Sequence, residues 1–109
     1  MDAKIPDLVH KLAECVYLYN NCFSACVEED GMEMMKECIR LDKECAQICA
    51  ATLVEVYPGS RFKREILTLC ANACRACGQE CAKFEQAHCQ DCAKACQACA
   101  EACETFIER

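Results

Sequence analysis

The sequence predicts an all-α fold: a single antiparallel four-helix bundle over residues 1–109 with a cysteine-lined core. Three observations lead to this prediction. Strong helix formers fill segments of similar length, and the whole chain has only 3 glycines and 2 prolines. Turn-forming or polar residues at 29–31, 57–60 and 85–88 separate these segments. Within each segment the cysteines recur in steps of three, four or seven, which places them on one helix face.

The first two expected helices form a hairpin. Pro6 suits the first turn of the first helix, and Gly31 suits a left-handed stop after Glu29-Asp30. The second helix extends to Pro58-Gly59, where a helix cannot continue. Both helices space their cysteines by seven and then four residues, so the two arms match. These cysteines are Cys15, Cys22 and Cys26 in the first helix, and Cys38, Cys45 and Cys49 in the second.

The third and fourth expected helices form a second hairpin. Ser60 can cap the third helix, and the polar residues 85–88 separate it from the fourth. Short connections make sequential helices antiparallel neighbours. Cysteines follow steps of three and four in both helices. They are Cys70, Cys74, Cys77 and Cys81 in the third helix, and Cys89, Cys92, Cys96, Cys99 and Cys103 in the fourth.

All 15 cysteines therefore fall on the seam that Leu and Ile normally fill in a bundle. Disulfides are disfavoured, because the count is odd and thiols one turn apart on a helix have Cβ atoms about 5–6 Å apart, too far for a bridge. An inert core of small thiols would leave voids that cost about 24 cal/mol per Å³. We therefore expect reduced thiols that point at one another and bind metal ions.

The choice of metal follows from ligand softness, since thiolates favour Cu(I), Zn(II) and iron–sulfur clusters. Zinc sites usually use cysteine pairs on turns, and the run from Cys89 to Cys103 lacks the spacing and closing Cys-Pro of a ferredoxin. One Cu(I) per thiolate neutralises the buried charge. We therefore predict a store of multiple Cu(I) ions per chain, roughly one per cysteine on this charge argument.

Other functions stay open as alternatives. A metallothionein-like Zn(II) or Cd(II) buffer and an iron–sulfur electron-transfer protein use the same sulfur ligands, and so does a protein that delivers copper to a partner. An enzyme is not expected, because no cysteine lies in a recognisable Cys/His nucleophile setting and 3 glycines leave no phosphate-binding loop.

The two ends of the expected bundle differ. Leucine, isoleucine, valine and phenylalanine gather at one end as an apolar plug, made of Leu8, Leu12, Leu53, Val56, Ile66, Leu67, Phe106 and Ile107. The other end brings Met34, Met35 and His88 beside the cysteines, where metal is expected to enter. Thioether and imidazole bind Cu(I) more weakly than thiolate, so these residues suit catching an ion and passing it inward. The alternatives are that His88 is a solvated turn residue and that the methionines make only core contacts.

Charge and the N-terminal residues bear on partners and location. A formal net charge of −6 argues against nucleic acid or an anionic membrane as a partner. The segment Met1–Pro6 has neither an apolar signal region nor paired arginines, so we expect a cytoplasmic protein.

The four cysteine stripes together resemble the bacterial copper storage proteins, a family of four-helix bundles with cysteine-lined cores and a Met- or His-bearing mouth. The resemblance covers the whole chain and rests on all 15 cysteines, which are more specific than any single Cys-x2-Cys pair. It implies Cu(I) storage and a homotetramer, and this sequence is similar to the cytosolic members. Cysteine number varies within the family, so the copper stoichiometry does not carry over.

Overall fold

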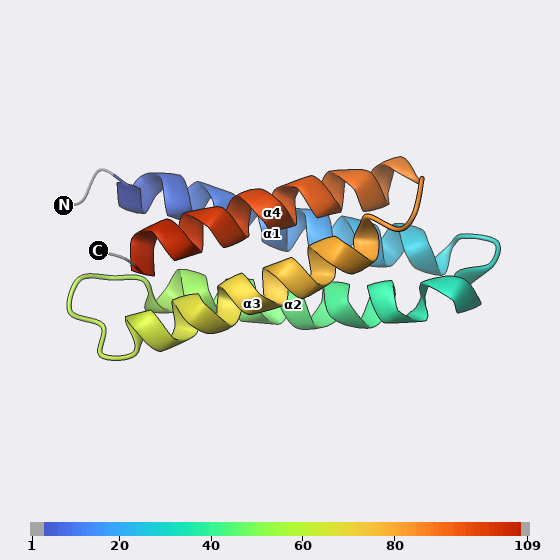
Figure 1. Ribbon diagram of the computed structural model, residues 1–109. Helices are drawn as coiled ribbons and strands as arrows, with labels where there is room; N and C mark the ends of the chain where they lie inside the picture. The colour runs from blue at the N-terminus through green and yellow to red at the C-terminus, as the bar shows by residue number, and fades with distance from the viewer. Residues whose placement is uncertain (1–3, 108–109) are drawn as a thin grey trace.

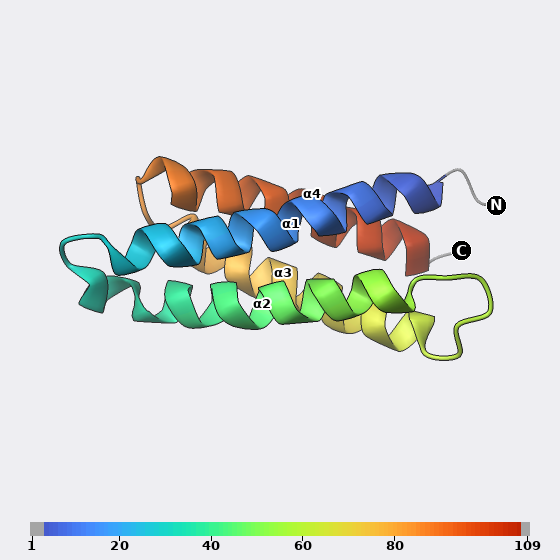
Figure 2. The ribbon, with the colours of Figure 1, turned by 180° about the vertical axis from the view of Figure 1, so that it is seen from behind.

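The computed structural model describes residues 4–107, which fold into four α-helices and one short 3₁₀ helix. Along these residues the order is α1 (Lys4–Val27), η1 (Met32–Met35), α2 (Lys36–Glu55), α3 (Lys63–Cys81) and α4 (Ala87–Ile107). The four α-helices run antiparallel to their sequence neighbours and lie side by side (Figures 1 and 2). The prediction of an all-α four-helix bundle is therefore confirmed.

The bundle is long and narrow, with principal extents of 46 × 19 × 18 Å. Its helices pack in a ring, α1 against α2, α2 against α3, α3 against α4, and α4 against α1. The α1–α2 and α3–α4 connections lie at one end, which we call the His88 end (Figure 1). The α2–α3 connection lies at the opposite end, which we call the plug end. The ring leaves one continuous seam along the axis for the side chains that face inward.

The predicted turn residues have mixed outcomes. Gly31 and Gly59 have φ angles of 80° and 88°, the left-handed conformation that favours glycine after a helix. Pro6 lies in the first turn of α1, as expected. The expectation that Ser60 caps the third helix is wrong, because α3 begins only at Lys63. The Ser60 hydroxyl instead donates a hydrogen bond of 3.1 Å to Glu55, which closes the α2–α3 loop.

Glycine has a packing role at one position inside a helix. A Cβ atom at Gly78 of α3 would lie 3.0 Å from the Cβ atom of Cys96 on α4, closer than ordinary van der Waals contact. The missing side chain therefore allows α3 and α4 to approach each other closely beside the core. This contact brings the two cysteine-richest helices together.

The apolar plug is confirmed. Its side chains are buried at five positions and half-buried at three; the buried ones are Leu8, Leu12, Val56, Leu67 and Phe106, and the half-buried ones are Leu53, Ile66 and Ile107. Fully burying one leucine is worth roughly 1.5–3 kcal/mol, so this end supplies much of the conventional hydrophobic stabilisation. Within the described part of the chain, no helix combines the length and the hydropathy needed to cross a bilayer.

Candidate metal-binding core

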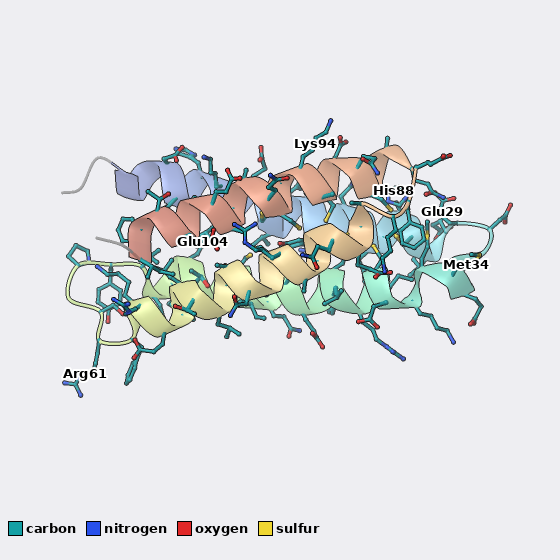
Figure 3. The ribbon with its side chains drawn as sticks, in the orientation of Figure 1. Glu29, Met34, Arg61, His88, Lys94 and Glu104 are labelled. Atoms are coloured by element: carbon teal, nitrogen blue, oxygen red, sulfur yellow. The ribbon has the colours of Figure 1, made fainter. Side chains whose placement is uncertain are left out.

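The cysteine side chains form the central part of the core. All 15 are free thiols, and each is at most 1% exposed. Charged side chains such as Lys94 and Glu104 project outward, whereas the sulfur atoms lie between the helices (Figure 3). The cysteine stripes therefore face the interior of the bundle, as their spacing predicted. Every one of the 15 cysteines lies in the seam.

Two further residues occupy this seam and were missed in the sequence analysis. Tyr19 lies between Cys15 and Cys22 on α1, and Asp42 lies between Cys38 and Cys45 on α2. Each fills the gap in a seven-residue cysteine step, four residues after one cysteine and three before the next. Both side chains are fully buried. The helical phase alone would have placed them in the core, but only cysteines were followed along the stripes.

Asp42 brings a carboxyl group among the thiols. Its Oδ1 atom lies 3.4 Å from the sulfur of Cys77, 3.5 Å from that of Cys92 and 3.7 Å from that of Cys81. Burial, together with the nearby Cys81 sulfur, raises the pKa of Asp42 to about 9. The metal-free protein therefore keeps this carboxyl group largely protonated at neutral pH, and a bound cation would favour its ionised form.

Tyr19 places a phenol hydroxyl deeper in the seam. The hydroxyl donates a hydrogen bond of 3.1 Å to the sulfur of Cys74 and accepts one of 3.1 Å from the thiol of Cys96. Burial is the largest cause that raises the pKa of Tyr19 far above its ordinary value, so the hydroxyl stays protonated. Tyr19 is thus a neutral, fully hydrogen-bonded group inside a sulfur-lined core.

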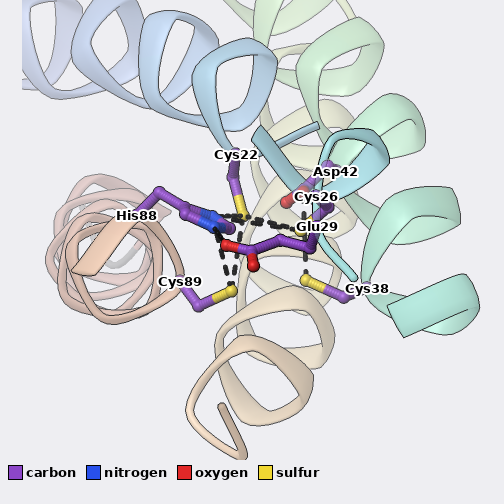
Figure 4. A network of polar contacts seen from close by, with 7 residues as sticks. All are labelled: Cys22, Cys26, Glu29, Cys38, Asp42, His88 and Cys89. Carbon is purple, nitrogen blue, oxygen red and sulfur yellow. Dashed lines mark hydrogen bonds and ion pairs between the residues drawn. The ribbon is translucent and has the colours of Figure 1, made fainter. Parts of the chain in front are cut away.

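His88 lies at the mouth of the seam, in the first turn of α4 rather than in the preceding connection. Its Nδ1 atom is 3.5 Å from the sulfur of Cys22, 3.5 Å from that of Cys89 and 3.9 Å from that of Cys26. Its Nε2 atom is 3.1 Å from a carboxylate oxygen of Glu29. Figure 4 shows the two side chains next to each other. The ring therefore bridges the sulfur core and a surface carboxylate. Glu29 was treated only as a turn residue in the sequence analysis, because its contact with His88 spans 59 residues.

One thiol beside His88 has a lowered pKa. Interaction with the Cys38 thiol is the largest cause that lowers the pKa of Cys22 to about 5, and His88 lowers it further. Burial lowers the pKa of His88, but the contacts with Cys22 and Glu29 raise it by more, so the net shift is upward. An imidazolium beside a thiolate is a favourable pair. Cys22 therefore favours the thiolate form, which is the form that binds metal ions.

Most of the other thiols with a shifted pKa have it raised, which favours the protonated form; Cys74, Cys81 and Cys96 are the exceptions, with lowered pKa values. Burial is the largest cause that raises the pKa of Cys26 to about 12, and it likewise raises the pKa of Cys89. Metal ligation requires the thiolate, so binding at these sites releases protons.

The two methionines have different positions. Met35 is 3% exposed and belongs to the core at the His88 end, whereas Met34 is 82% exposed. Met34 points away from the bundle at its tip (Figure 3). Of the predicted entrance residues, the structure therefore brings His88 and Met35 to the seam and leaves Met34 outside it.

The ligand atoms gather in four groups whose members all lie within 4.8 Å of one another. Three groups consist of thiols alone and one includes a carboxylate. The groups are Cys22, Cys26, Cys38 and Cys89; Cys22, Asp42, Cys81 and Cys92; Cys77, Cys92 and Cys96; and Cys49, Cys70, Cys74 and Cys99. Soft sulfur ligands at such separations suit Cu(I), which accepts two or three thiolates and shares them between ions.

Comparison with protein families gives a match along nearly the whole chain. The family model described as copper storage protein (Csp) matches residues 1–108. A relative from Bacillus subtilis, the uncharacterized cysteine-rich protein YhjQ, is 48% identical over 77 residues, or 71% of each chain.

Solved structures of similar proteins share the bundle. The Cu(I)-bound copper storage protein BsCsp3 of Bacillus subtilis is 42% identical, with a TM-score of 0.90 over 95% of this chain and 98% of its own. A cytosolic copper storage protein from Streptomyces lividans, solved with five coppers, is 31% identical, with a TM-score of 0.92 over 97% of this chain and 93% of its own.

Proposed function

Because the chain belongs to the copper storage protein family, we propose that it stores multiple Cu(I) ions on the thiolates of its core cysteines. The observation that carries this proposal is the complete burial of 15 free thiols along one seam. Binding one or two metal ions would not require so many unbridged sulfur atoms in one small bundle. The solved relatives bound to copper support Cu(I) as the metal, and they lend no support to a zinc buffer or an iron–sulfur protein.

Charge compensation supports a high copper capacity. A buried thiolate costs several kcal/mol unless it is paired, and one Cu(I) per thiolate leaves the seam neutral. Each ion bound to a protonated thiol releases one proton, so loading exchanges protons for copper without adding charge to the core. We propose roughly one Cu(I) per cysteine, on this charge argument.

The proposed ligands are all 15 cysteines of the seam, and Asp42 joins them in one of the four groups. We propose that copper enters at the His88 end. His88 faces three thiols there, and its side chain is 14% exposed, so it lies between solvent and the seam. Met35 is buried at the same end and is a candidate for a transient ligand; Met34 would have to act from the surface.

The remaining assignments follow from the family and from the sequence. We propose one bundle domain over residues 1–109, a cytoplasmic location, a homotetramer and a role in storage without catalysis. The cytosolic Streptomyces relative supports the location.

An anaerobic Cu(I) titration of the fully reduced apoprotein tests the proposal, with a competing chromophoric chelator reporting the copper bound per chain. We expect tight uptake of about ten or more ions and a colourless product with ultraviolet thiolate-to-copper absorption bands. Saturation at one or two ions would reject storage and leave a delivery protein or another metal to be identified by elemental analysis.

A further inference from the structure

The four groups of ligand atoms are not equally connected. Cys22 belongs to two of them and Cys92 to two, so the three groups nearer the His88 end form a continuous set. The fourth group shares no cysteine with the others among the residues that the structure describes. We call the connected thiols the outer set: Cys22, Cys26, Cys38, Cys77, Cys81, Cys89, Cys92 and Cys96. We call the separate group the inner set: Cys49, Cys70, Cys74 and Cys99.

Tyr19 lies where the two sets meet. Its hydroxyl accepts a hydrogen bond from Cys96 of the outer set and donates one to Cys74 of the inner set, each 3.1 Å long. The side chain is fully buried and is the largest fully buried side chain of the protein's described part. A phenol therefore occupies the position where the repeat of α1 would otherwise supply a further thiol.

Both hydrogen bonds have to change before a metal ion can bridge the two sulfur atoms that they join. The Tyr19 hydroxyl donates to a sulfur lone pair of Cys74, so it occupies one side of that sulfur and reduces the electron density available to a metal ion there. Cys96 donates its S–H proton to Tyr19, so this hydrogen bond has to break when the thiol becomes the thiolate that copper requires. Copper that moves between the two sets by way of Cys96 and Cys74 has to displace the hydroxyl from both partners.

Burial makes that displacement slow. The ring is 0% exposed, so it cannot move into solvent without opening the bundle, and packed interiors resist such rearrangement. We propose that Tyr19 divides the store into two compartments, with the outer set filling first and the inner set filling only when the Tyr19 hydroxyl leaves Cys74 and Cys96. This inference rests on the proposed copper storage.

Rapid-mixing measurements test the division. Fully reduced apoprotein is mixed with excess Cu(I) under anaerobic conditions, and the thiolate-to-copper absorption is followed with time. The wild-type protein is expected to load in a fast and a slow phase. Tyr19→Phe keeps the ring but removes the hydroxyl, so it is expected to accelerate the slow phase about fivefold, the effect of losing about one net neutral hydrogen bond, without changing total capacity.

Tyr17→Phe is the matched control, because Tyr17 lies on the same helix but is 67% exposed. It is expected to leave both phases unchanged. Cys70→Ala identifies the slow phase independently of Tyr19, since it removes a thiol of the inner set only. Its slow-phase amplitude should fall while the fast phase keeps its rate and amplitude.

The outcomes separate this inference from the proposed function. Three outcomes would overturn the division while leaving storage intact. The wild-type protein could reach high capacity in a single phase, Tyr19→Phe could leave the slow phase unchanged or retard it, or Cys70→Ala could lose fast-phase amplitude. Uptake of only one or two ions by the wild-type protein would instead overturn storage itself. If Tyr19→Phe does not fold, as judged by circular dichroism, the wild-type phases and Cys70→Ala still decide the question.

Discussion

The plug end and the sulfur-lined seam occupy equivalent positions of the same helices but serve different purposes. Leu8 and Leu12 continue the stripe that Cys15 begins on α1, and both kinds of side chain are buried to the same degree. Leucine fills volume and excludes water, whereas cysteine is smaller and offers a ligand atom. The contrast teaches that one end of the bundle holds the fold while the remainder is free to bind metal.

The largest expected effect comes from removing a plug residue. Leu12→Ala should lower the free energy of unfolding of the reduced apoprotein by about 2–5 kcal/mol, because it leaves a cavity in the apolar end. Copper capacity should be unchanged as long as the bundle is folded. Chemical denaturation followed by circular dichroism measures the free energy of unfolding, and Cu(I) titration measures the copper capacity.

Cys99→Ala is the matched change in the seam. It should cost about 1 kcal/mol of apoprotein stability, since less volume is lost, but it should lower copper capacity. Equal losses of unfolding free energy in Leu12→Ala and Cys99→Ala would contradict the statement that the plug end contributes more to stability than the seam does.

The carboxyl group buried in the seam gives the next effect. The folded-state pKa of Asp42, about 9, lies above its ordinary value of 3.8, so the folded protein retains a proton that the unfolded chain has lost. This contribution to stability is fully present below about pH 4 and is lost as the pH rises toward 9. Asp42→Asn removes the titration and should stabilise the apoprotein by about 2 kcal/mol near pH 8.

The pH dependence makes the Asp42 prediction specific. The stabilising effect of Asp42→Asn should shrink between pH 8 and pH 5, at no more than about 1.4 kcal/mol per pH unit. Unfolding free energies of both proteins, measured across that range under reducing conditions, check it. An advantage that is constant with pH would show that the carboxyl group is not held protonated in the fold.

His88 tests the entrance, where the expected effect is kinetic. His88→Ala should slow copper loading or extraction several-fold, roughly tenfold if the ring contributes one good transient ligand. Capacity should not change, because the thiols remain. His10→Ala is the control, since His10 lies exposed on α1. A reduced number of copper ions bound by His88→Ala would make His88 a ligand of stored metal instead.

The smallest effect concerns the partner of His88. Glu29 contributes to the raised pKa of His88, so Glu29→Gln should lower that pKa and let the imidazole remain neutral at more acidic pH. The pH below which loading slows should then move downward, and only modestly because Glu29 is partly exposed. Loading rates measured from pH 5 to 8 test it, and an unmoved profile would show that the His88–Glu29 contact does not act on entry.

Much of this molecule was predictable from local patterns. The steps between cysteines predicted which helix faces meet, and the breakers at Gly31 and Pro58-Gly59 predicted the ends of the first and second helices. The expectation that Ser60 caps the third helix failed, because its hydroxyl donates to the Glu55 carboxylate across the loop and does not accept from a backbone N–H. Such a choice depends on loop conformation, which composition does not specify.

Helical periodicity by itself determined the all-α fold, the buried stripe of cysteines and the difference between the plug end and the His88 end. In an α-helix each residue turns by a fixed angle, so the spacing of residues along the sequence sets the helix face on which their side chains lie. Only the tertiary structure decided how the thiols group, which sulfur atoms Asp42 and Tyr19 contact, and how Glu29 reaches His88. These contacts join residues of different helices, or of a connection and a helix, at distances of a few ångströms. They depend on the axial offset and close approach of the helices, which no spacing within a single helix records.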